Sequence, residues 1–249
     1  ALIPQEQAFV DALKKLPLSA QQLTEIHKKF TMYRDFVDNT NSKFNLISHN
    51  DLDKLYNRHF LDAIFPQSGL PELFVSHETI QPRRTLDVGC GAGFPGIPLA
   101  ILNPGFQHLS VDSNKKKSGW IEELALLLGL KNVAVQSERA EEMARLPEYR
   151  EQFDLVYARA LAKPQTAVEL VLPFLKIGGH GLFWASGAEW NDEAPLNRVS
   201  GILGCSKIKR VPYLLPDEQT ERWIAVIRKV SSTPAHYPRR GGAMKRSLV

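Results

Sequence analysis

One segment constrains the fold of this chain more than any other: a short apolar run, a glycine-rich turn and the start of a helix. Residues 86–93 spell Leu-Asp-Val-Gly-Cys-Gly-Ala-Gly, with glycine at the alternate positions Gly89, Gly91 and Gly93. Glycine is needed where a backbone takes positive φ or approaches a ligand closely. The N-terminus of the helix that follows favours negatively charged groups. The segment therefore predicts a first strand, a tight turn and a cofactor pocket.

After residue 84 the sequence alternates between strand and helix patterns. Such alternation predicts a parallel, doubly wound sheet. The last two expected strands have no obvious helix between them, so we expect them to form an antiparallel edge. The predicted fold class is α/β, with a mostly parallel seven-stranded sheet. The expected strands are 85–88, 107–111, 132–135, 153–157, 181–185, 206–211 and 222–228, and the expected helices are 95–101, 115–128 and 166–174.

The first third of the chain predicts an N-terminal helical extension instead. Apolar side chains recur there at helical spacing, and Ser19 with Gln22 forms a capping-box pattern. A further helix is expected from Asp51 towards Phe65. We therefore expect three parts: an N-terminal helical region at 1–68, a cofactor-binding domain at 69–230 and a basic C-terminal tail at 231–249.

Positive charge is concentrated near the C-terminus. The net charge is only +4, yet residues 222–249 contain no acidic residue and are rich in lysine and arginine. Basic clusters fit phosphate-rich partners such as nucleic acid. The tail residues expected to contact phosphates are Arg239, Arg240, Lys245 and Arg246.

Other features of the sequence argue against several classes of protein. The apolar runs are too short to span a bilayer, and residues 1–16 lack the continuous apolar core of a signal peptide. Cys90 and Cys205 lack the spacing of a zinc site, and nothing indicates a disulfide framework. We expect a cytoplasmic, monomeric protein with no metal and no membrane partner.

The glycine turn alone fits two kinds of cofactor. Residues 91–96 match the G-x-G-x-x-G fingerprint of dinucleotide-binding folds, and Asp112 after the second strand suits a ribose in either case. Asp87 lies two residues before Gly89, where a carboxylate disfavours a pyrophosphate but favours a sulfonium cation and an amino group. Pro95 restricts the turn that would wrap a pyrophosphate. Both features favour S-adenosylmethionine and a Rossmann-like class I methyltransferase.

The sequence becomes more specific beyond the turn. Residues 87–98 closely resemble the bacterial small-subunit rRNA guanine-N7 methyltransferases, the glucose-inhibited division protein B family. The resemblance runs from about Phe44 to the end of the chain. It implies S-adenosylmethionine as cofactor and 16S rRNA or the small ribosomal subunit as substrate. The other segments that carry the resemblance, in order, are 44–46, 58–63, 139–142, 158–160 and 237–240.

The resemblance also implies roles for individual positions. Gly89 and Phe94 would line the methionine and adenosyl part of the pocket. Ala140 and Glu141 would flank the adenine, and Arg159 would lie where cofactor and substrate meet. The full set of expected cofactor-binding residues is Asp87, Gly89, Gly91, Gly93, Phe94, Asp112, Ala140, Glu141 and Arg159.

One position departs from the family pattern. The family usually carries Lys-Gly after the fifth strand, whereas this chain has Ser186 followed by Gly187. A cation expected near the RNA phosphates or the target base is therefore missing. Trp184 and Trp190 flank this position, and they either stack an extruded base or pack in the core.

Methylation at guanine N7 agrees with the side chains that the sequence offers. N7 has a free in-plane lone pair and attacks a sulfonium methyl without first losing a proton, so positioning is sufficient. Exocyclic-amine methyltransferases resemble one another in an Asn/Asp-Pro-Pro-aromatic element after the fourth strand, and this sequence lacks that element there. Neither Cys90 nor Cys205 is placed as the nucleophile that pyrimidine C5 methylation needs. Arg159 and Arg139 are the candidate catalytic residues, with a structural salt bridge as the alternative for each.

Arg58 and His59 are the remaining site candidates. They either contact RNA or dock the helical region on the sheet, and docking is favoured because a lone histidine on a helix is more often structural. The main hypothesis is transfer of a methyl group to N7 of a guanine in 16S rRNA. The alternatives are a methyltransferase for a small molecule or protein, and a non-catalytic RNA-binding or cell-division factor that retains the fold.

Overall fold

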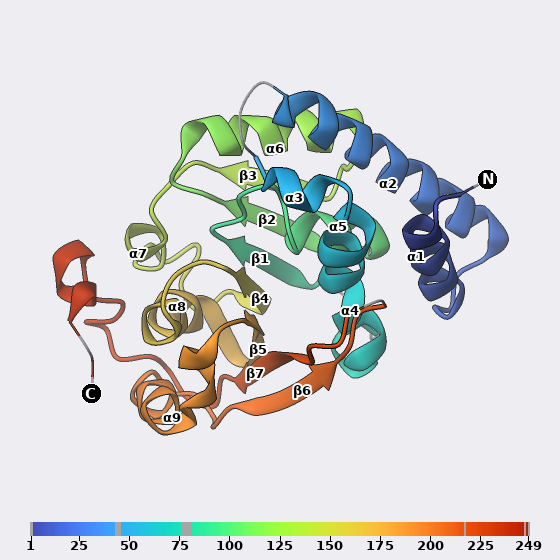
Figure 1. Cartoon of the computed structure of the whole chain (residues 1–249). Coiled ribbons are helices and arrows are strands. Elements are labelled where there is room, and N and C mark those ends of the chain that lie inside the picture. The colour runs from blue at the N-terminus through green and yellow to red at the C-terminus, as the bar shows by residue number, and fades with distance from the viewer. Residues whose placement is uncertain (1, 43–45, 76–80, 217, 247, 249) are drawn as a thin grey trace.

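The computed structural model describes residues 2–42, 46–75, 81–216, 218–246 and 248. They form a seven-stranded sheet with helices on both faces (Figure 1). The strand order is β3-β2-β1-β4-β5-β7-β6. The first five strands run parallel, and β7 is antiparallel to β5 and β6, as the sequence predicts. The strands are β1 (Arg84–Val88), β2 (Gln107–Val111), β3 (Val133–Gln136), β4 (Phe153–Arg159), β5 (Leu175–Ala185), β6 (Lys209–Tyr213) and β7 (Arg222–Arg228).

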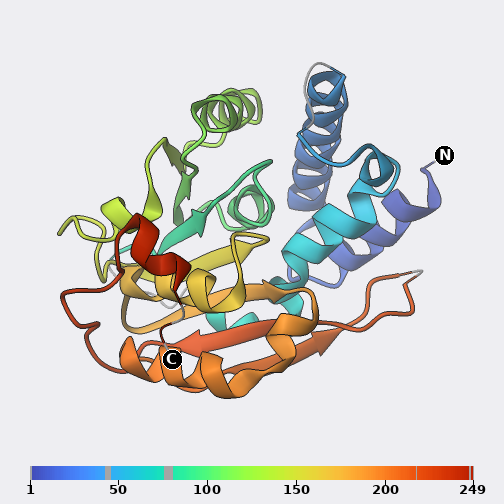
Figure 2. The same cartoon turned by 60° about the vertical axis from the view of Figure 1, so that its left-hand side comes forward.

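The central strands are buried by helices from both sides, which is why their sequences are almost continuously apolar. One face carries α5 and α6, and the other carries α7, α8 and α9 (Figures 1 and 2). The chain builds β1, β2 and β3 outwards and then returns to place β4 beside β1. Ligands of such sheets bind at this reversal, beyond the carboxyl ends of the strands. These helices are α5 (Gly96–Leu102), α6 (Lys115–Leu127), α7 (Ala140–Met143), α8 (Pro164–Val171) and α9 (Glu193–Ile202).

The N-terminal helices pack on the face of the sheet that carries α5 and α6 (Figure 1). The capping box at the start of α2 is present: Gln22 N donates to Ser19 Oγ at 3.2 Å, and Ser19 N donates to Gln22 Oε1 at 2.8 Å. Buried aromatic rings of this region share one apolar cluster with Ile97 and Ile121 of the sheet domain. The helices are α1 (Pro4–Lys14), α2 (Ala20–Asn41), α3 (His49–Leu52), a π-helix (Leu55–Leu61) and α4 (Asp62–Gly69).

The structure differs from the sequence prediction in several elements. Helix α7 was not predicted, and β5 begins at Leu175 rather than at Gly181. The helix expected from Asp51 to Phe65 is divided into α3, the π-helix and α4. The segment after β5 contains α9, which was not predicted because its apolar side chains are few and Pro195 lies inside it. Short 3₁₀ turns occupy Pro71–Leu73, Leu172–Phe174, Ala188–Asn191 and Gly241–Lys245.

The C-terminal segment lies against the helices at the opposite side from the N-terminus (Figure 2). Arg150 donates to the carbonyl oxygens of Thr233 and Tyr237 at 2.9 and 2.8 Å, which ties this segment to the domain. Lys229 is fully buried, and its Nζ contacts Glu151 at 3.2 Å. None of the helices in the described ranges is long and apolar enough to cross a membrane.

Candidate functional site

The glycine turn between β1 and α5 has the backbone that the sequence predicts. Gly89, Gly91 and Gly93 all take positive φ, at 70°, 53° and 90°. Gly91 N donates to Asp112 Oδ2 at 3.0 Å, and Gly89 N donates to the carbonyl oxygen of Val111 at 2.8 Å. The turn is therefore held against the end of β2, and the structure brings the predicted glycines and the predicted acid together.

A cavity of about 330 Å³ opens beside this turn. It falls within the size range of small-molecule sites. Of the expected cofactor residues it is lined by Gly89, Asp112, Ala140 and Glu141, and Arg139 also lines it. Arg139 Nη1 donates to Glu141 Oε1 at 2.9 Å, so this arginine belongs to the wall of this cavity, which is called the smaller cavity below. The remaining lining residues are Val88, Val111, Ser113, Lys117, Glu138, Ala160, Leu161 and Leu170.

Five of the nine expected cofactor residues do not line this cavity: Asp87, Gly91, Gly93, Phe94 and Arg159. Asp87 is fully buried, and its Oδ2 accepts a hydrogen bond from Gly96 N at 2.8 Å, which anchors the start of α5. Its Oδ1 is buried without a hydrogen-bond partner among the described atoms. Burial raises the pKa of Asp87 to about 7, an effect that Arg159 partly opposes. Phe94 is also buried, stacked on Tyr33 with ring centroids 5.3 Å apart.

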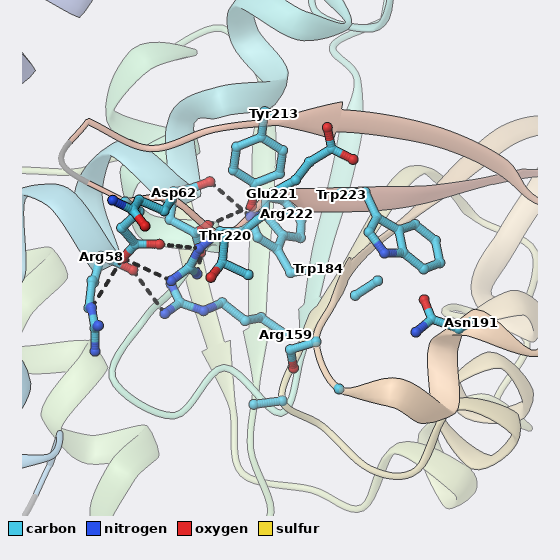
Figure 3. Close-up of a pocket in the computed structure, with 16 residues that line it drawn as sticks. Arg58, Asp62, Arg159, Trp184, Asn191, Tyr213, Thr220, Glu221, Arg222 and Trp223 are labelled. Atoms are coloured by element: carbon cyan, nitrogen blue, oxygen red, sulfur yellow. Dashed lines mark hydrogen bonds and ion pairs between the residues drawn. The ribbon is translucent and has the colours of Figure 1, made fainter.

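A second and larger cavity, of about 790 Å³, lies beyond the ends of β4, β5 and β7 (Figure 3). Arg159 and Trp184 form part of its wall, and Ser186 marks the position of the missing family lysine. The chain between β6 and β7 contributes the opposite side. The other lining residues are Arg58, Asp62, Ala160, Ala185, Gly187, Asn191, Tyr213, Glu218, Gln219, Thr220, Glu221, Arg222 and Trp223.

A cluster of charged side chains centres on Asp62 in this wall (Figure 3). Its side chain is only 1% exposed, and it lies 3.2 Å from Arg159 Nη1 and 3.4 Å from Arg222 Nη1. Tyr213 Oη donates to Asp62 Oδ1 at 2.5 Å. Glu218 in turn bridges Arg222 and Arg58, at 3.0 and 3.2 Å. Three segments far apart in the sequence therefore meet through paired charges.

His59 belongs to the same cluster as an uncharged acceptor. Its Nδ1 lies 3.1 Å from Arg159 Nη2, which also donates to the carbonyl oxygen of Arg58 at 3.1 Å. Burial, and after it the charge of Arg159, lower the pKa of His59 to about 3. The residue is 8% exposed. This placement supports docking of the helical region rather than an RNA contact by the imidazole.

The sequence matches one family of proteins over most of its length. The family model described as rRNA small subunit methyltransferase G matches residues 26–212. The chain belongs to this family.

Curated relatives agree with the family match. A protein of Lachnoclostridium phytofermentans is 35% identical over 236 residues, covering 94% of this chain and 93% of its own. A protein of Halalkalibacterium halodurans is 39% identical over 229 residues, covering 90% of both chains. Both are named ribosomal RNA small subunit methyltransferase G. As a member of this family, the chain is an S-adenosylmethionine-dependent rRNA methyltransferase.

Solved structures share the fold at low sequence identity. A methyltransferase dependent on S-adenosylmethionine from Aquifex aeolicus has a TM-score of 0.51 at 18% identity, over 74% of this chain and 100% of its own. The CurJ carbon methyltransferase has a TM-score of 0.56 at 14% identity, over 92% of this chain and 72% of its own. Both likenesses show the Rossmann-like methyltransferase fold alone.

The basic tail of this methyltransferase is partly engaged with the domain. Arg239 forms a bidentate pair with Glu169, with Nη2 2.7 Å from Oε2 and Nε 3.0 Å from Oε1. Arg240 lies 3.7 Å from Glu142 with both side chains exposed, and Arg246 is exposed. The side chain of Lys245 and residues 43–45, including Phe44, lie outside the described residues. Arg240 and Arg246 are therefore the expected tail cations whose described side chains are exposed.

Several residues of the site escaped prediction from the sequence. Asp62 pairs with both Arg159 and Arg222, and only the fold brings these three side chains together. Trp184 and Trp190 are both buried, whereas Trp223 is half-buried on the cavity wall with Arg210 4.1 Å from its ring centre. The one sequence signal for Asp62 was the resemblance of residues 58–63 to the family, which did not indicate the partners of this side chain.

Proposed function

We propose that this methyltransferase transfers a methyl group to N7 of a guanine in 16S rRNA, in the cytoplasm. The observation that carries the proposal is the meeting of the two cavities at Ala160, just after β4, because Ala160 lines both. Ala160 takes a positive φ of 52°, a conformation that is unfavourable for a residue other than glycine and is found most often at functional sites. A cofactor in the smaller cavity and a base in the larger one would therefore face each other across this residue.

The lining of the smaller cavity supports S-adenosylmethionine as its ligand. Asp112 offers carboxylate oxygens to ribose hydroxyls, and Ala140 and Glu141 offer a wall for the adenine. The buried Asp87 supplies negative charge behind the turn once it is ionised. When bound, the cofactor supplies an electrophilic methyl group on a positively charged sulfur.

The larger cavity suits a nucleophile that needs no general base. Its described lining contains no histidine, cysteine or lysine, and the carboxylates of Asp62 and Glu218 are occupied by arginines. N7 presents a lone pair and needs only to be aligned with the methyl group. Positive charge develops on the purine during transfer, and the carboxylate of Glu221, which lines the cavity and is exposed, would help to stabilise it. Arg159 is held by Asp62, so its own charge is largely compensated.

The test uses small ribosomal subunits and free 16S rRNA from a strain that lacks the gene. Purified protein and labelled S-adenosylmethionine are added, and nucleosides are separated by mass spectrometry. We expect label in 7-methylguanosine at a single nucleotide. Label in another nucleoside would contradict the N7 assignment, and equal labelling of free small acceptors without RNA would favour the alternative of a small-molecule methyltransferase.

A further inference from the structure

Helix α2 lies outside the cofactor-binding sheet, yet one of its side chains reaches the glycine turn. Tyr33 is fully buried, and its hydroxyl donates to the carbonyl oxygen of Ala92 at 2.5 Å. Ala92 lies between Gly91 and Gly93, in the middle of the turn. The N-terminal helical region therefore contacts the backbone that shapes the cofactor cavity.

The turn is held from two sides. On the side of β2, Asp112 accepts from Gly91 N at 3.0 Å. On the side of α2, the Tyr33 hydroxyl fills the space next to Gly93, where a Cβ atom would lie 2.6 Å from Tyr33 Oη. The Tyr33 ring also stacks on Phe94, with centroids 5.3 Å apart and planes 7° from parallel. Gly93 is thus required by Tyr33 as well as by its positive φ.

The hydroxyl is a constant donor across the working pH range. Burial and the neighbouring Asp87 both raise the pKa of Tyr33 well above its usual value, so the proton stays on the oxygen. A buried carbonyl that loses its donor pays the desolvation cost of an unpaired polar group. Without the hydroxyl the turn would relax until water reached Ala92, and cofactor binding would have to reverse that relaxation.

Two other hydrogen bonds attach α2 to the sheet domain without touching the turn. Lys29 Nζ donates to the carbonyl oxygen of Leu128 at 2.5 Å, and Trp120 Nε1 donates to Thr40 Oγ1 at 2.7 Å. Thr40 is buried, as Tyr33 is. These contacts dock the helix on α6. Removing one of them therefore tests the effect of docking without disturbing the contact between Tyr33 and the turn.

We propose that Tyr33 is a positioning residue of the cofactor site: it holds the Ala92 carbonyl so that the glycine turn is preorganised for S-adenosylmethionine. The N-terminal helical region is then part of the cofactor site, although none of its described residues lines the smaller cavity. By thermodynamic reciprocity, cofactor binding also strengthens the docking of α2 around Tyr33.

The first test is calorimetric titration of Tyr33→Phe with S-adenosylmethionine, without RNA. We expect the dissociation constant to rise about tenfold, within the cost of an unpaired buried carbonyl. The matched control is Thr40→Val, which removes the hydrogen bond to Trp120 and leaves the turn untouched. It should lower the melting temperature while the dissociation constant stays within about twofold of the original.

A second control is Tyr56→Phe, whose hydroxyl donates to Glu6 at 3.3 Å within the helical region. It should leave cofactor affinity unchanged. An unchanged dissociation constant in Tyr33→Phe would overturn the proposal. An equal loss in Thr40→Val would also overturn it, because the effect would then belong to docking of the helix as a whole.

The reciprocal test needs no substitution. Hydrogen exchange of the original protein is compared with and without S-adenosylmethionine. We expect slower exchange both in residues 89–95 and in the part of α2 around Tyr33. Protection of the turn with no change in α2 would contradict the proposal. Neither test involves rRNA, so failure here is distinct from failure of the N7 assignment.

Discussion

Asp62 and Arg159 form an ion pair of 3.2 Å that joins the start of α4 to the end of β4. Asp62 is almost completely buried, while Arg159 retains 19% exposure of its side chain at the cavity wall. Arg222 and Tyr213 complete the coordination of the carboxylate. The pair thus connects the N-terminal helices, the central sheet and the antiparallel edge at the place where a substrate base would lie.

Replacing Asp62 by asparagine should damage both stability and activity. Removing one partner of a buried charge cluster leaves uncompensated charge, and because both arginines reach solvent we expect a loss of about 2 kcal/mol rather than the full cost. Urea unfolding measures the loss. The value of kcat/KM on small subunits should fall more than cofactor affinity does. Asp11→Asn is the control, since Asp11 forms an exposed pair with Lys14 outside this cluster, and equal effects of the two substitutions would argue against a special role for Asp62.

Asp112→Ala should weaken S-adenosylmethionine binding. The carboxylate accepts from Gly91 N at 3.0 Å and from Asn114 N at 2.9 Å, so its loss frees the turn and removes the ribose acceptor. Two such contacts correspond to a dissociation constant higher by about 30-fold or more in calorimetric titration. Glu138→Gln changes a charge on the wall of the same cavity without touching the turn. Its dissociation constant for the cofactor should stay within about threefold of that of the original protein. A loss of affinity as large as that of Asp112→Ala would mean that negative charge on the cavity wall, and not the hydrogen bonds of Asp112, accounts for the effect.

The buried carboxyl of Asp87 should make stability depend on pH in a defined direction. Its pKa is about 7 in the folded protein and about 4 when unfolded. Between these values the folded state holds a proton that the unfolded chain has lost, so this group reduces stability as pH rises from about 4 to about 7. Asp87→Asn lacks the titration and keeps an acceptor for Gly96 N. Relative to the original protein, it should gain about 1–3 kcal/mol of unfolding free energy between pH 5 and pH 8. An equal pH dependence of both proteins would show that Asp87 is ionised throughout.

The two kinds of arginine in the tail should behave differently. Arg246→Ala removes an exposed cation, so the slope of the logarithm of the rRNA binding constant against the logarithm of salt concentration should become shallower by about one unit. The free energy of unfolding should stay within about 0.5 kcal/mol of the original. Arg239→Ala removes the cation that pairs with the buried Glu169, which then keeps only the hydrogen bond from the backbone N of residue 239 among those described, and it should destabilise the protein by about 2 kcal/mol. Filter binding at several salt concentrations and thermal unfolding measure both effects. A loss of stability in Arg246→Ala equal to that in Arg239→Ala would contradict the distinction.

The local features of the fold could be predicted because each depends on neighbours in the chain. The capping box at Ser19 and the positive φ of the turn glycines are set within a few residues. The parallel sheet and its antiparallel edge also follow from the order of strand and helix patterns. The helix α9 was missed because a short helix with few apolar side chains has little periodic signal.

The sheet, the glycine turn and the acid that faces it could be predicted from the amino-acid sequence, since these features are encoded in short continuous segments. The side chains that surround Arg159, and the support of the turn by Tyr33 of α2, depend instead on how distant segments pack. Tyr33 and Ala92 are 59 residues apart, and Asp62 and Arg222 are 160 apart. Such pairings arise when burial brings distant segments together and a buried polar group must find a partner, and no local pattern records which partner it finds.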